Sequence, residues 1–250
     1  MGVGLQINKF NDLNVFITGA SSGIGLAVAK SFLRMGSNVY AVDNNMIKDE
    51  EFLSHTKGNF YLSDICDYDK MYKIINDIFK KVVNIDVLIN CAGIISFKSI
   101  ENSSYEFWKK IIEVNLSGTF ITCKHIVPTM KINKKGSVIN VSSRAAKFGG
   151  MNETAYCASK FGIEGFSRSL SEECKLYNIA VNSITPGTPI HTAMSQETYS
   201  IEKKKIWKDP IFISPAFLHL GIQDSNGINN QYVDAWKLSQ EIKSKYETYK

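Results

Sequence analysis

Tyr156 and Lys160 are four residues apart, the spacing of neighbours on one helix face, and Ser143 precedes the tyrosine by thirteen residues. The unperturbed pKa of a tyrosine is about 10, so a tyrosine acts as a base near neutral pH only when a cation stabilises its phenolate. Two opposite charges ~4 Å apart at an effective dielectric of ~20 interact by roughly 4 kcal/mol, or about three pKa units. Ser143 ends an apolar, strand-like run and could donate a hydrogen bond to a substrate oxygen. The trio predicts proton transfer between a tyrosine and that oxygen.

The tyrosine–lysine spacing alone is not specific, because it occurs four times in the chain. The other three pairs are Tyr105–Lys109, Tyr199–Lys203 and Tyr246–Lys250. The residues thirteen positions before these tyrosines are Ala92, Pro186 and Val233, and none of them has a side-chain hydroxyl. For these three pairs we favour a solvated helix face, and only for the pair at Tyr156 do we favour a functional role.

Size and composition indicate one globular domain spanning residues 1–250. Hydrophobic residues make up 44% of the 250 residues and charged residues 21%, as in ordinary soluble proteins. Five scattered cysteines without a Cys-x-x-Cys pair favour reduced thiols in a cytoplasmic protein over disulfides or a metal site. The first ten residues lack the apolar core of a signal peptide, and no apolar run is long enough for a membrane span.

The net charge of +5 could indicate an anionic partner. The lysines, however, occur in small groups with acidic residues between many of them, and no basic stripe with interleaved aromatic residues is present. We therefore expect solvated helix faces and no nucleic-acid partner.

Apolar strand-like runs alternate with helical patterns along the chain. Strands are predicted at residues 15–18, 38–42, 60–62, 86–89, 137–141 and 180–184, and helices at about 23–35, 68–82, 104–130 and 154–177. This alternation with near-continuous apolar strands predicts a single-domain α/β fold of the Rossmann type, a doubly wound parallel sheet with helices on both faces.

A glycine-rich segment, Thr18–Gly25, lies between the first predicted strand and the first helix. Glycines there permit a tight turn and let a pyrophosphate approach the amides at the helix N-terminus. Asp43 ends the second strand, where a carboxylate could bind both ribose hydroxyls and repel a 2′-phosphate. Ser22 and Asn44 occupy the places where an NADP-binding chain would have a basic residue. We therefore expect NAD as the cofactor.

Together these motifs resemble the classical short-chain dehydrogenase/reductase family over almost the whole chain. Thr18–Gly25 is similar to its TGxxxGxG turn, and residues 90–93, Asn-Cys-Ala-Gly, are similar to its NNAG motif with cysteine replacing the second asparagine. Residues 64–65 occupy the place of its adenine-contacting pair, and residues 186–187 match its proline–glycine after the sixth strand.

The resemblance implies hydride transfer between NAD(H) and a secondary alcohol or ketone. Tyr156 would take or return the hydroxyl proton, Ser143 would hold the substrate oxygen, and Lys160 would favour the phenolate and hold the nicotinamide ribose. Asn115 is expected to anchor a water that links Lys160 to solvent. The implied cofactor contacts are Gly19, Ser21, Ser22, Gly23, Ile24, Gly25, Asp43, Asp64, Ile65, Asn90, Ala92, Gly93, Tyr156, Lys160, Pro186, Gly187, Ile190 and Thr192.

Two segments depart from the family pattern. The family threonine is expected five residues beyond Pro186, but Thr192 is six beyond it, so either one residue is inserted or Pro189 bends the loop differently. Before the last strand, Asn230 replaces a family glycine, and residues 237–250 are expected to form an extra polar helix or a frayed end.

Substrate choice is expected to depend on a loop at about 188–215, with Arg144, Phe148 and Gly149 on the opposite wall. Ser195, Gln196, Glu197 and Tyr199 make that loop polar, which favours a small polar substrate such as a sugar, polyol or hydroxy acid. The alternatives are an NADP-dependent reductase of 3-oxoacyl or related carbonyl substrates and, with less support, a non-catalytic nucleotide-binding sensor.

Subunit pairing is expected through the helices near 104–130 and 154–177, as the resemblance implies. Phe161, Phe166 and Leu170 fall on related helical turns, consistent with a buried face within or between subunits. A homotetramer or a homodimer is therefore expected.

Overall fold

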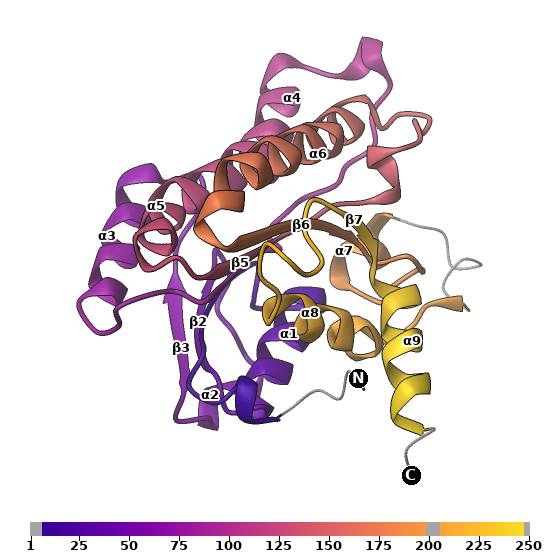
Figure 1. Cartoon of the computed structure of the whole chain (residues 1–250). Coiled ribbons are helices and arrows are strands. Elements are labelled where there is room, and N and C mark those ends of the chain that lie inside the picture. The colour runs from indigo at the N-terminus through magenta and orange to yellow at the C-terminus, as the bar shows by residue number, and fades with distance from the viewer. Residues whose placement is uncertain (1–6, 199–205, 248–250) are drawn as a thin grey trace.

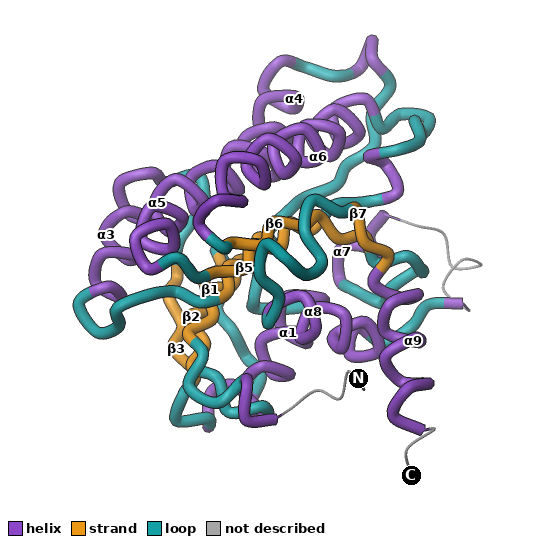
Figure 2. Tube along the Cα trace, viewed as in Figure 1, coloured by secondary structure: helices purple, strands orange, loops and turns teal. Residues whose placement is uncertain are grey.

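The computed structural model describes residues 7–198 and 206–247, and within them seven parallel strands form one sheet (Figures 1 and 2). The strand order is β3-β2-β1-β4-β5-β6-β7. The strands are β1 Asn14–Thr18, β2 Asn38–Asp43, β3 Gly58–Leu62, β4 Val87–Asn90, β5 Gly136–Val141, β6 Ile179–Thr185 and β7 Tyr232–Asp234. The predicted Rossmann-type doubly wound sheet is confirmed.

Helices cover both faces of this sheet, with α3, α4, α5 and α6 on one face and α1, α8 and α9 on the other (Figure 1). Their bounds are α1 Gly23–Arg34, α2 Glu50–Ser54, α3 Tyr68–Phe79, α4 Tyr105–Ile112, α5 Gly118–Asn133, α6 Thr154–Cys174, α7 Ala193–Thr198, α8 Ser214–Gly221 and α9 Ala235–Glu247. No helix in the described part of the chain is long and apolar enough to cross a membrane.

The strands are apolar on both sides because each side faces a layer of helices. On β1, Val15 and Ile17 pack with Phe32 of α1 in one core cluster. Phe16, between them, packs with Leu88 of β4 in the other cluster, on the side of α3 and α5. This alternation explains why the strands show continuous apolar runs in the sequence.

The predicted helix at 104–130 is divided in the structure. α4 ends at Ile112, a π-helical turn spans Glu113–Ser117, and α5 follows. A π turn inserts one residue into the helical repeat, and such turns often occur at functional sites. Asn115 lies in this turn, and its contacts, described below, supply the physical reason for the division.

Three short or buried helices, α2, α7 and α8, were not predicted. α8 starts within the segment assigned to the substrate loop, and its residues 216–218 and 220 are buried. An apolar run buried all round has no amphipathic period, so its sequence shows no helical pattern. The predicted polar helix at the C-terminal end is present as α9, which begins two residues earlier, at Ala235.

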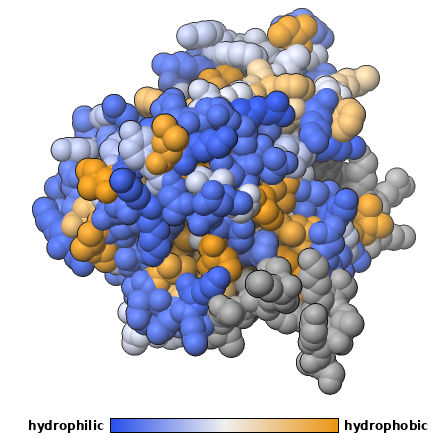
Figure 3. Space-filling view, viewed as in Figure 1, coloured by the Kyte–Doolittle hydropathy of each residue, from blue (hydrophilic) through white to orange (hydrophobic). Residues whose placement is uncertain are grey.

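The surface seen in Figure 3 is mostly hydrophilic, with separate apolar groups. Tyr105 on α4 is exposed, and Lys109 forms an ion pair with Glu113. This pair of tyrosine and lysine is therefore a solvated helix face, as expected. Tyr199, Lys203 and Lys250 lie outside the described residues.

The chain leaves β1 toward β2 and β3 in one direction and continues from β4 to β7 in the other. In open α/β sheets, the crevice at such a switch point, beside the carboxyl ends of the strands, is where ligands bind. The glycine-rich turn, the Asn-Cys-Ala-Gly segment, Ser143 and Pro186 lie at the carboxyl ends of β1, β4, β5 and β6, and the two predicted acids lie at those of β2 and β3.

Candidate active site

The glycine-rich turn between β1 and α1 has the backbone that a phosphate-binding turn requires. Gly19 and Gly23 have φ angles of +68° and +55°, a region that favours glycine. A Cβ on Gly25 would lie 2.0 Å from the carbonyl oxygen of Gly19. Ser22 makes no side-chain cap to α1, whose first turn contains no acidic residue. The N–H groups of that turn, near Ser21, Ser22 and Ile24, therefore fit a pyrophosphate.

Asp43 places a carboxylate beside this turn. Its Oδ2 accepts a hydrogen bond from the backbone N–H of Ser21 (3.0 Å), and its Oδ1 accepts one from Asn45 (2.8 Å). Asp64, which follows the neighbouring strand β3, is exposed, and its Oδ1 accepts from the backbone N–H of Cys66 (2.8 Å). Both predicted acids therefore lie at the carboxyl edge of the sheet.

The ends of β1 and β4 are joined at the switch point. The Thr18 hydroxyl accepts hydrogen bonds from the backbone N–H groups of Cys91 and Ala92, both at 3.1 Å. A Cβ on Gly93 would lie 3.2 Å from Oδ1 of Asn115 and 3.8 Å from Nζ of Lys160. The Asn-Cys-Ala-Gly segment thus runs from the phosphate turn to the predicted catalytic residues.

Asn115 is buried and fastens the segment after β4 to α6. Its Oδ1 accepts from the backbone N–H of Ile94 (2.7 Å), and its Nδ2 donates to the Ile94 carbonyl and to the Ser159 hydroxyl, both at 3.0 Å. Both hydrogens of the carboxamide are therefore used. A water bound to Asn115 would have to donate to one of its two carbonyl oxygens.

Lys160 is buried next to Tyr156. Its ammonium lies 5.7 Å from the centroid of the Tyr156 ring and donates a 2.9 Å hydrogen bond to the carbonyl oxygen of Val141. Burial lowers the pKa of Lys160 to about 8, while Cys91 and Glu164 act in the opposite direction. Burial also raises the pKa of the Cys91 thiol to about 12, so this thiol stays neutral. The arrangement can hold a cation beside a phenolate near neutral pH.

Ser143 is the second residue after β5, and three side chains hold the backbone at this strand end. Lys160 binds the carbonyl of Val141, Ser142 donates its hydroxyl to a Glu164 carboxylate oxygen (2.5 Å), and the Tyr232 hydroxyl donates to the Ser143 carbonyl (3.0 Å). The Ser143 Oγ accepts from the backbone N–H of Ala145 (3.2 Å), which leaves its proton for another acceptor. Ser143 can therefore donate to a substrate oxygen.

Three predicted cofactor residues have side chains in the core instead of the crevice. The Asn90 carboxamide donates to Oδ1 of Asn140 at 2.8 Å. Ile65 is buried against Gly118, where a Cβ would lie 2.9 Å from its Cγ2, and Ile190 is buried in the core cluster beside α1. Any contact of these residues with a cofactor therefore comes from their backbone.

The segment after β6 is fixed at its start by β7 and α9. Gly187 has a φ of +74°, and a Cβ there would lie 1.9 Å from a carboxylate oxygen of Asp234. The backbone N–H of Trp236 donates to the Pro186 carbonyl (3.1 Å). This packing places Pro186 and Gly187 at the carboxyl edge, beside β7.

The segment between Gly187 and Thr192 forms a short parallel bridge, in which Ile190 pairs with Lys208. The Ser195 hydroxyl donates to the Ile190 carbonyl (2.7 Å). Thr192 nevertheless reaches the phosphate turn, since a Cβ on Gly23 would lie 3.0 Å from its methyl group. Thr192 thus lies against the glycine-rich turn.

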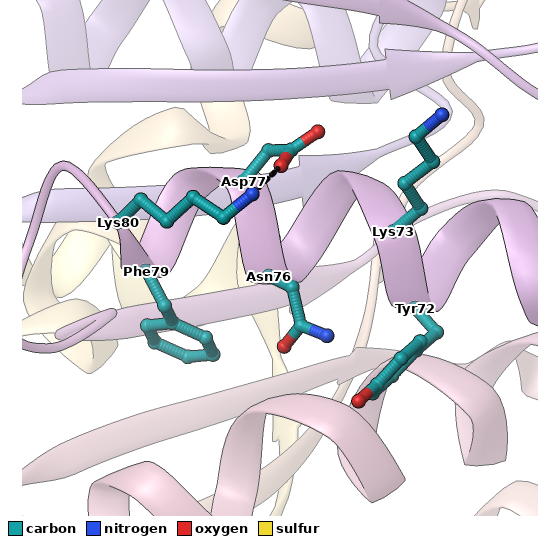
Figure 4. Close-up of a pocket in the computed structure, with 6 residues that line it drawn as sticks. All are labelled: Tyr72, Lys73, Asn76, Asp77, Phe79 and Lys80. Atoms are coloured by element: carbon teal, nitrogen blue, oxygen red, sulfur yellow. Dashed lines mark hydrogen bonds and ion pairs between the residues drawn. The ribbon is translucent and has the colours of Figure 1, made fainter.

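Two cavities differ in their relation to this site. One of about 290 Å³ lies between α1 and the segment after β6, and Gly23 and Thr192 are among its lining residues. The other, of about 660 Å³, is lined by six residues of α3 and the turn after it, and Tyr72, Asn76 and Phe79 point to the same side of the helix (Figure 4). It contains no predicted site residue.

Sequence reasoning missed Glu164 and Tyr232. Glu164 follows Lys160 by four residues, so both lie on one face of α6, and this spacing was a usable signal. Tyr232 contacts Ser143 from 89 positions away, which no local pattern indicates.

Comparison with known proteins agrees with this geometry. The short chain dehydrogenase family matches residues 13–203. The 3-oxoacyl-[acyl-carrier-protein] reductase FabG of Thermotoga maritima is 30% identical over 87% of this chain and 93% of its own. D-threitol dehydrogenase of Mycolicibacterium smegmatis is 32% identical over 68% of this chain and 67% of its own.

Among solved structures, ElxO with NADP bound superposes with a TM-score of 0.80 at 26% identity, covering 92% of this chain and 100% of that one. The family match covers well over half of the chain, and the ordered motifs, the sheet and the position of Lys160 between Tyr156 and the end of β5 agree with it. The chain therefore belongs to the short-chain dehydrogenase family of NAD(P)-dependent oxidoreductases.

Proposed function

We propose that the chain, acting as one cofactor-binding and catalytic domain, transfers a hydride between NAD(H) and a secondary alcohol or ketone. The observation that carries this proposal is the position of the Lys160 ammonium, buried, bonded to Val141 and 5.7 Å from the Tyr156 ring. A Tyr156 phenolate would give this buried ammonium an anionic partner one helical turn away on α6. NAD, when bound, accepts a hydride from the carbinol carbon.

The proton leaves the substrate through the protein's own residues. Ser143 donates a hydrogen bond to the substrate oxygen. The phenolate of Tyr156 acts as the base and takes the hydroxyl proton. The Lys160 ammonium stabilises that phenolate electrostatically. In the reverse direction the Tyr156 hydroxyl returns the proton to the oxygen of the ketone.

Asp43 supports NAD in preference to NADP. Its two carboxylate oxygens accept from Ser21 and Asn45, and this places a negative charge next to the predicted ribose site. A 2′-phosphate there would face like charge, and Ser22 and Asn44, at the places where an NADP-binding chain would have a basic residue, supply no cation to offset it. ElxO, whose structure contains NADP, shares the fold at 26% identity, so the cofactor has to be measured for this chain.

For the substrate we propose a small polar secondary alcohol such as a sugar, polyol or hydroxy acid. The relative that acts on D-threitol supports this class. Of the polar loop residues, Ser195 bonds within its own loop and Gln196 contacts His191 at 2.7 Å. The similarity to D-threitol dehydrogenase therefore supports a polar substrate more strongly than the polar residues of the loop do. Tyr199 lies outside the described residues.

A 3-oxoacyl or related carbonyl reductase is the second candidate. The similarity to FabG favours it. So do large apolar side chains exposed after β5 and after β6, since Phe148 is 65% exposed, Met151 89% and Met194, on α7, 40%. Such side chains could cover an acyl chain.

One experiment tests both candidates. Nicotinamide reduction and oxidation are followed with NAD(H) and NADP(H) across polyols, sugars, hydroxy acids and 3-oxoacyl thioesters, with Tyr156→Phe alongside. We expect NAD-linked turnover that the variant loses while it still binds NADH. Binding of NADH without turnover on any substrate would favour the nucleotide-binding sensor instead.

For assembly we propose a homotetramer or a homodimer formed through α5 and α6. Phe120 on α5 and Phe161 on α6 are about half exposed, at 48% and 51%, whereas Leu170 is buried within the subunit. Sedimentation of the wild type and of Phe161→Glu tests this, and a monomeric wild type would exclude it.

For localisation we propose the cytoplasm. The five free cysteines agree with a reducing compartment of that kind.

A further inference from the structure

Glu164 is a buried carboxylate that the proposed proton route does not use. It is 9% exposed, and both of its oxygens accept hydrogen bonds from buried serine hydroxyls. Ser142, after β5, donates to Oε1, and Ser183, on β6, donates to Oε2 at 2.7 Å. One side chain of α6 thus joins the ends of two neighbouring strands.

The contacts at this strand end are ordered along the backbone. Val141, Ser142 and Ser143 are each held by a different side chain, namely Lys160, Glu164 and Tyr232. Lys160 and Glu164 are one helical turn apart on α6, and the residue that Glu164 holds directly precedes Ser143. A displacement of Glu164 would therefore reach both the serine and the lysine of the predicted site.

The charged and titratable groups around this carboxylate come from several elements. Lys160 lies on the same helix, and Cys91, after β4, acts on Lys160 as well. Tyr232 of β7 lies close enough for Glu164 to raise its pKa, although burial is the larger cause. The ammonium of Lys147 is 3.9 Å from the centroid of the Tyr232 ring. Lys160 is thus the buried cation that the Glu164 charge faces.

We propose that Glu164 is a positioning residue for the reaction: its carboxylate fixes the end of β5 through Ser142 and supplies a negative charge one helical turn from Lys160. This inference rests on the proposed function of Tyr156 and Lys160. A buried carboxylate is costly unless it is hydrogen-bonded and paired. Two apolar residues could join α6 to the strands without that cost, whereas only an anion can also favour the ammonium.

The negative charge of Glu164 should favour the protonated forms of both Tyr156 and Lys160. Glu164→Gln removes a negative charge and keeps the shape and an acceptor for one serine. Without that charge, protons leave both Tyr156 and Lys160 more easily, so both titrations move to lower pH. We expect the whole pH–kcat profile to move toward acid by about one pH unit, the order expected for a buried charge one helical turn away.

Glu172→Gln is the matched control. Glu172 lies on the same helix two turns further on and is exposed, and it accepts from Asn230 at 2.9 Å. The same change of charge at a solvated position should leave the profile where it is, because solvent and salt screen it. Glu164→Asp keeps the charge but shortens the side chain. We expect the pH–kcat profile to stay where it is and kcat to fall at least about tenfold, since small misplacements cost up to about 10²-fold.

A second readout does not depend on turnover. The Tyr156 phenolate is titrated by its near-ultraviolet absorbance, taken as the difference between the wild type and Tyr156→Phe, with and without Glu164→Gln. If the proposed function fails, no substrate turns over, yet this titration still reports whether Glu164 acts on the pair.

An acid-shifted titration in Glu164→Gln together with an unmoved one in Glu172→Gln would support the proposal. A lower kcat with an unmoved titration would overturn it and leave Glu164 a structural residue. If Glu164→Gln fails to fold, Glu164→Asp decides, and wild-type kcat in that variant would also overturn the proposal.

Discussion

The ammonium of Lys160 donates a 2.9 Å hydrogen bond to the carbonyl oxygen of Val141, two residues before Ser143. A lysine has three N–H donors, and this bond uses one of them to fix the direction of the side chain. The backbone of β5 thus positions the serine and the lysine of the predicted site together. The other donors can serve the predicted contacts with Tyr156 and a ribose.

Replacing Lys160 with an apolar residue should abolish activity and raise the free energy of unfolding. Burial lowers its pKa from 10.5 to about 8, so the native state disfavours the charged form relative to the unfolded state. The penalty is complete below about pH 8 and disappears as pH rises through the unfolded pKa of about 10.5. We expect Lys160→Met to be inactive and more stable by roughly 1–2 kcal/mol near pH 7, after the lost hydrogen bond is subtracted.

Urea unfolding of the wild type and Lys160→Met near pH 7 and near pH 10 measures this difference. The advantage of the variant should shrink at the higher pH, because the wild type then carries a neutral amine. A variant that is less stable at both values of pH would show that the ammonium is well solvated or well paired in the native state.

The same pKa predicts the alkaline behaviour of catalysis. Since the Lys160 ammonium has a pKa of about 8, it is lost above that value, and the phenolate of Tyr156 then loses its cation. The kcat for alcohol oxidation should therefore fall with an apparent pKa near 8 at its alkaline limb. Stopped-flow measurement across pH checks this, and a rate that stays level to about pH 10 would contradict it.

Much of this site follows from the sequence because its parts are local. The glycine turn, the Tyr156–Lys160 spacing and the acid at the end of β2 are each encoded within a few residues, and the strand alternation brings their ends to one edge. The π turn at Asn115 is different. It forms because the carboxamide satisfies Ile94, 21 positions away, and no helical pattern in 104–130 indicates that contact.

The rest depends on packing between distant segments. The Asn90 carboxamide donates to Asn140 within the sheet, so the predicted cofactor contact of Asn90 would have to use its backbone. Glu164 was not singled out in the sequence, and its buried hydrogen bonds come from Ser142 and Ser183, which are 22 and 19 positions away. Sequence patterns show which face a residue occupies, not which partner satisfies it.

Asn115→Ala should destabilise the protein as well as reduce activity. The change leaves the N–H and C=O of Ile94 without their side-chain partner at a half-buried position. Unsatisfied polar groups cost about 1–3 kcal/mol each, so we expect a loss of roughly 2–4 kcal/mol. Asn133→Ala is the control, because Asn133 also donates to two backbone carbonyls but is exposed.

Chemical denaturation of both variants separates these effects. Water can replace Asn133 at its carbonyls, so that variant should lose less than about 1 kcal/mol. Equal losses in the two variants would mean that the π turn does not depend on the carboxamide.

Gly187→Ala should disturb the segment after β6. Its φ of +74° is unfavourable for alanine, and the new Cβ would lie 1.9 Å from Asp234 Oδ1. We expect a loss of at least about 2 kcal/mol and a raised KM for the cofactor. Gly149→Ala is the control, since no atom beyond the neighbouring residues of the chain lies within 4 Å of a Cβ there. Thermal unfolding and cofactor titration check both, and a neutral Gly187→Ala would contradict the tight packing.

Cofactor choice should respond to the charge of Asp43. Asp43→Asn removes the charge and keeps an acceptor for one of the two backbone N–H groups, Ser21 or Asn45. We expect the preference for NAD over NADP, measured as the ratio of kcat/KM, to fall by roughly tenfold to 10²-fold, since a lost charge contact is worth about 1.4–3 kcal/mol. Asp43→Arg should go further and favour NADP, because a guanidinium binds a phosphate.

The two variants separate charge from geometry. Both lose at least one of the hydrogen bonds from the backbone N–H groups of Ser21 and Asn45. Their thermal stabilities are therefore measured beside the kinetics, and the two cofactors are compared within one variant. A general weakening of the turn would raise KM for NAD and NADP alike and leave their ratio unchanged. An unchanged ratio in Asp43→Arg would therefore exclude Asp43 as the residue that selects the cofactor, whereas a reversed ratio at equal stability would assign that selection to its charge.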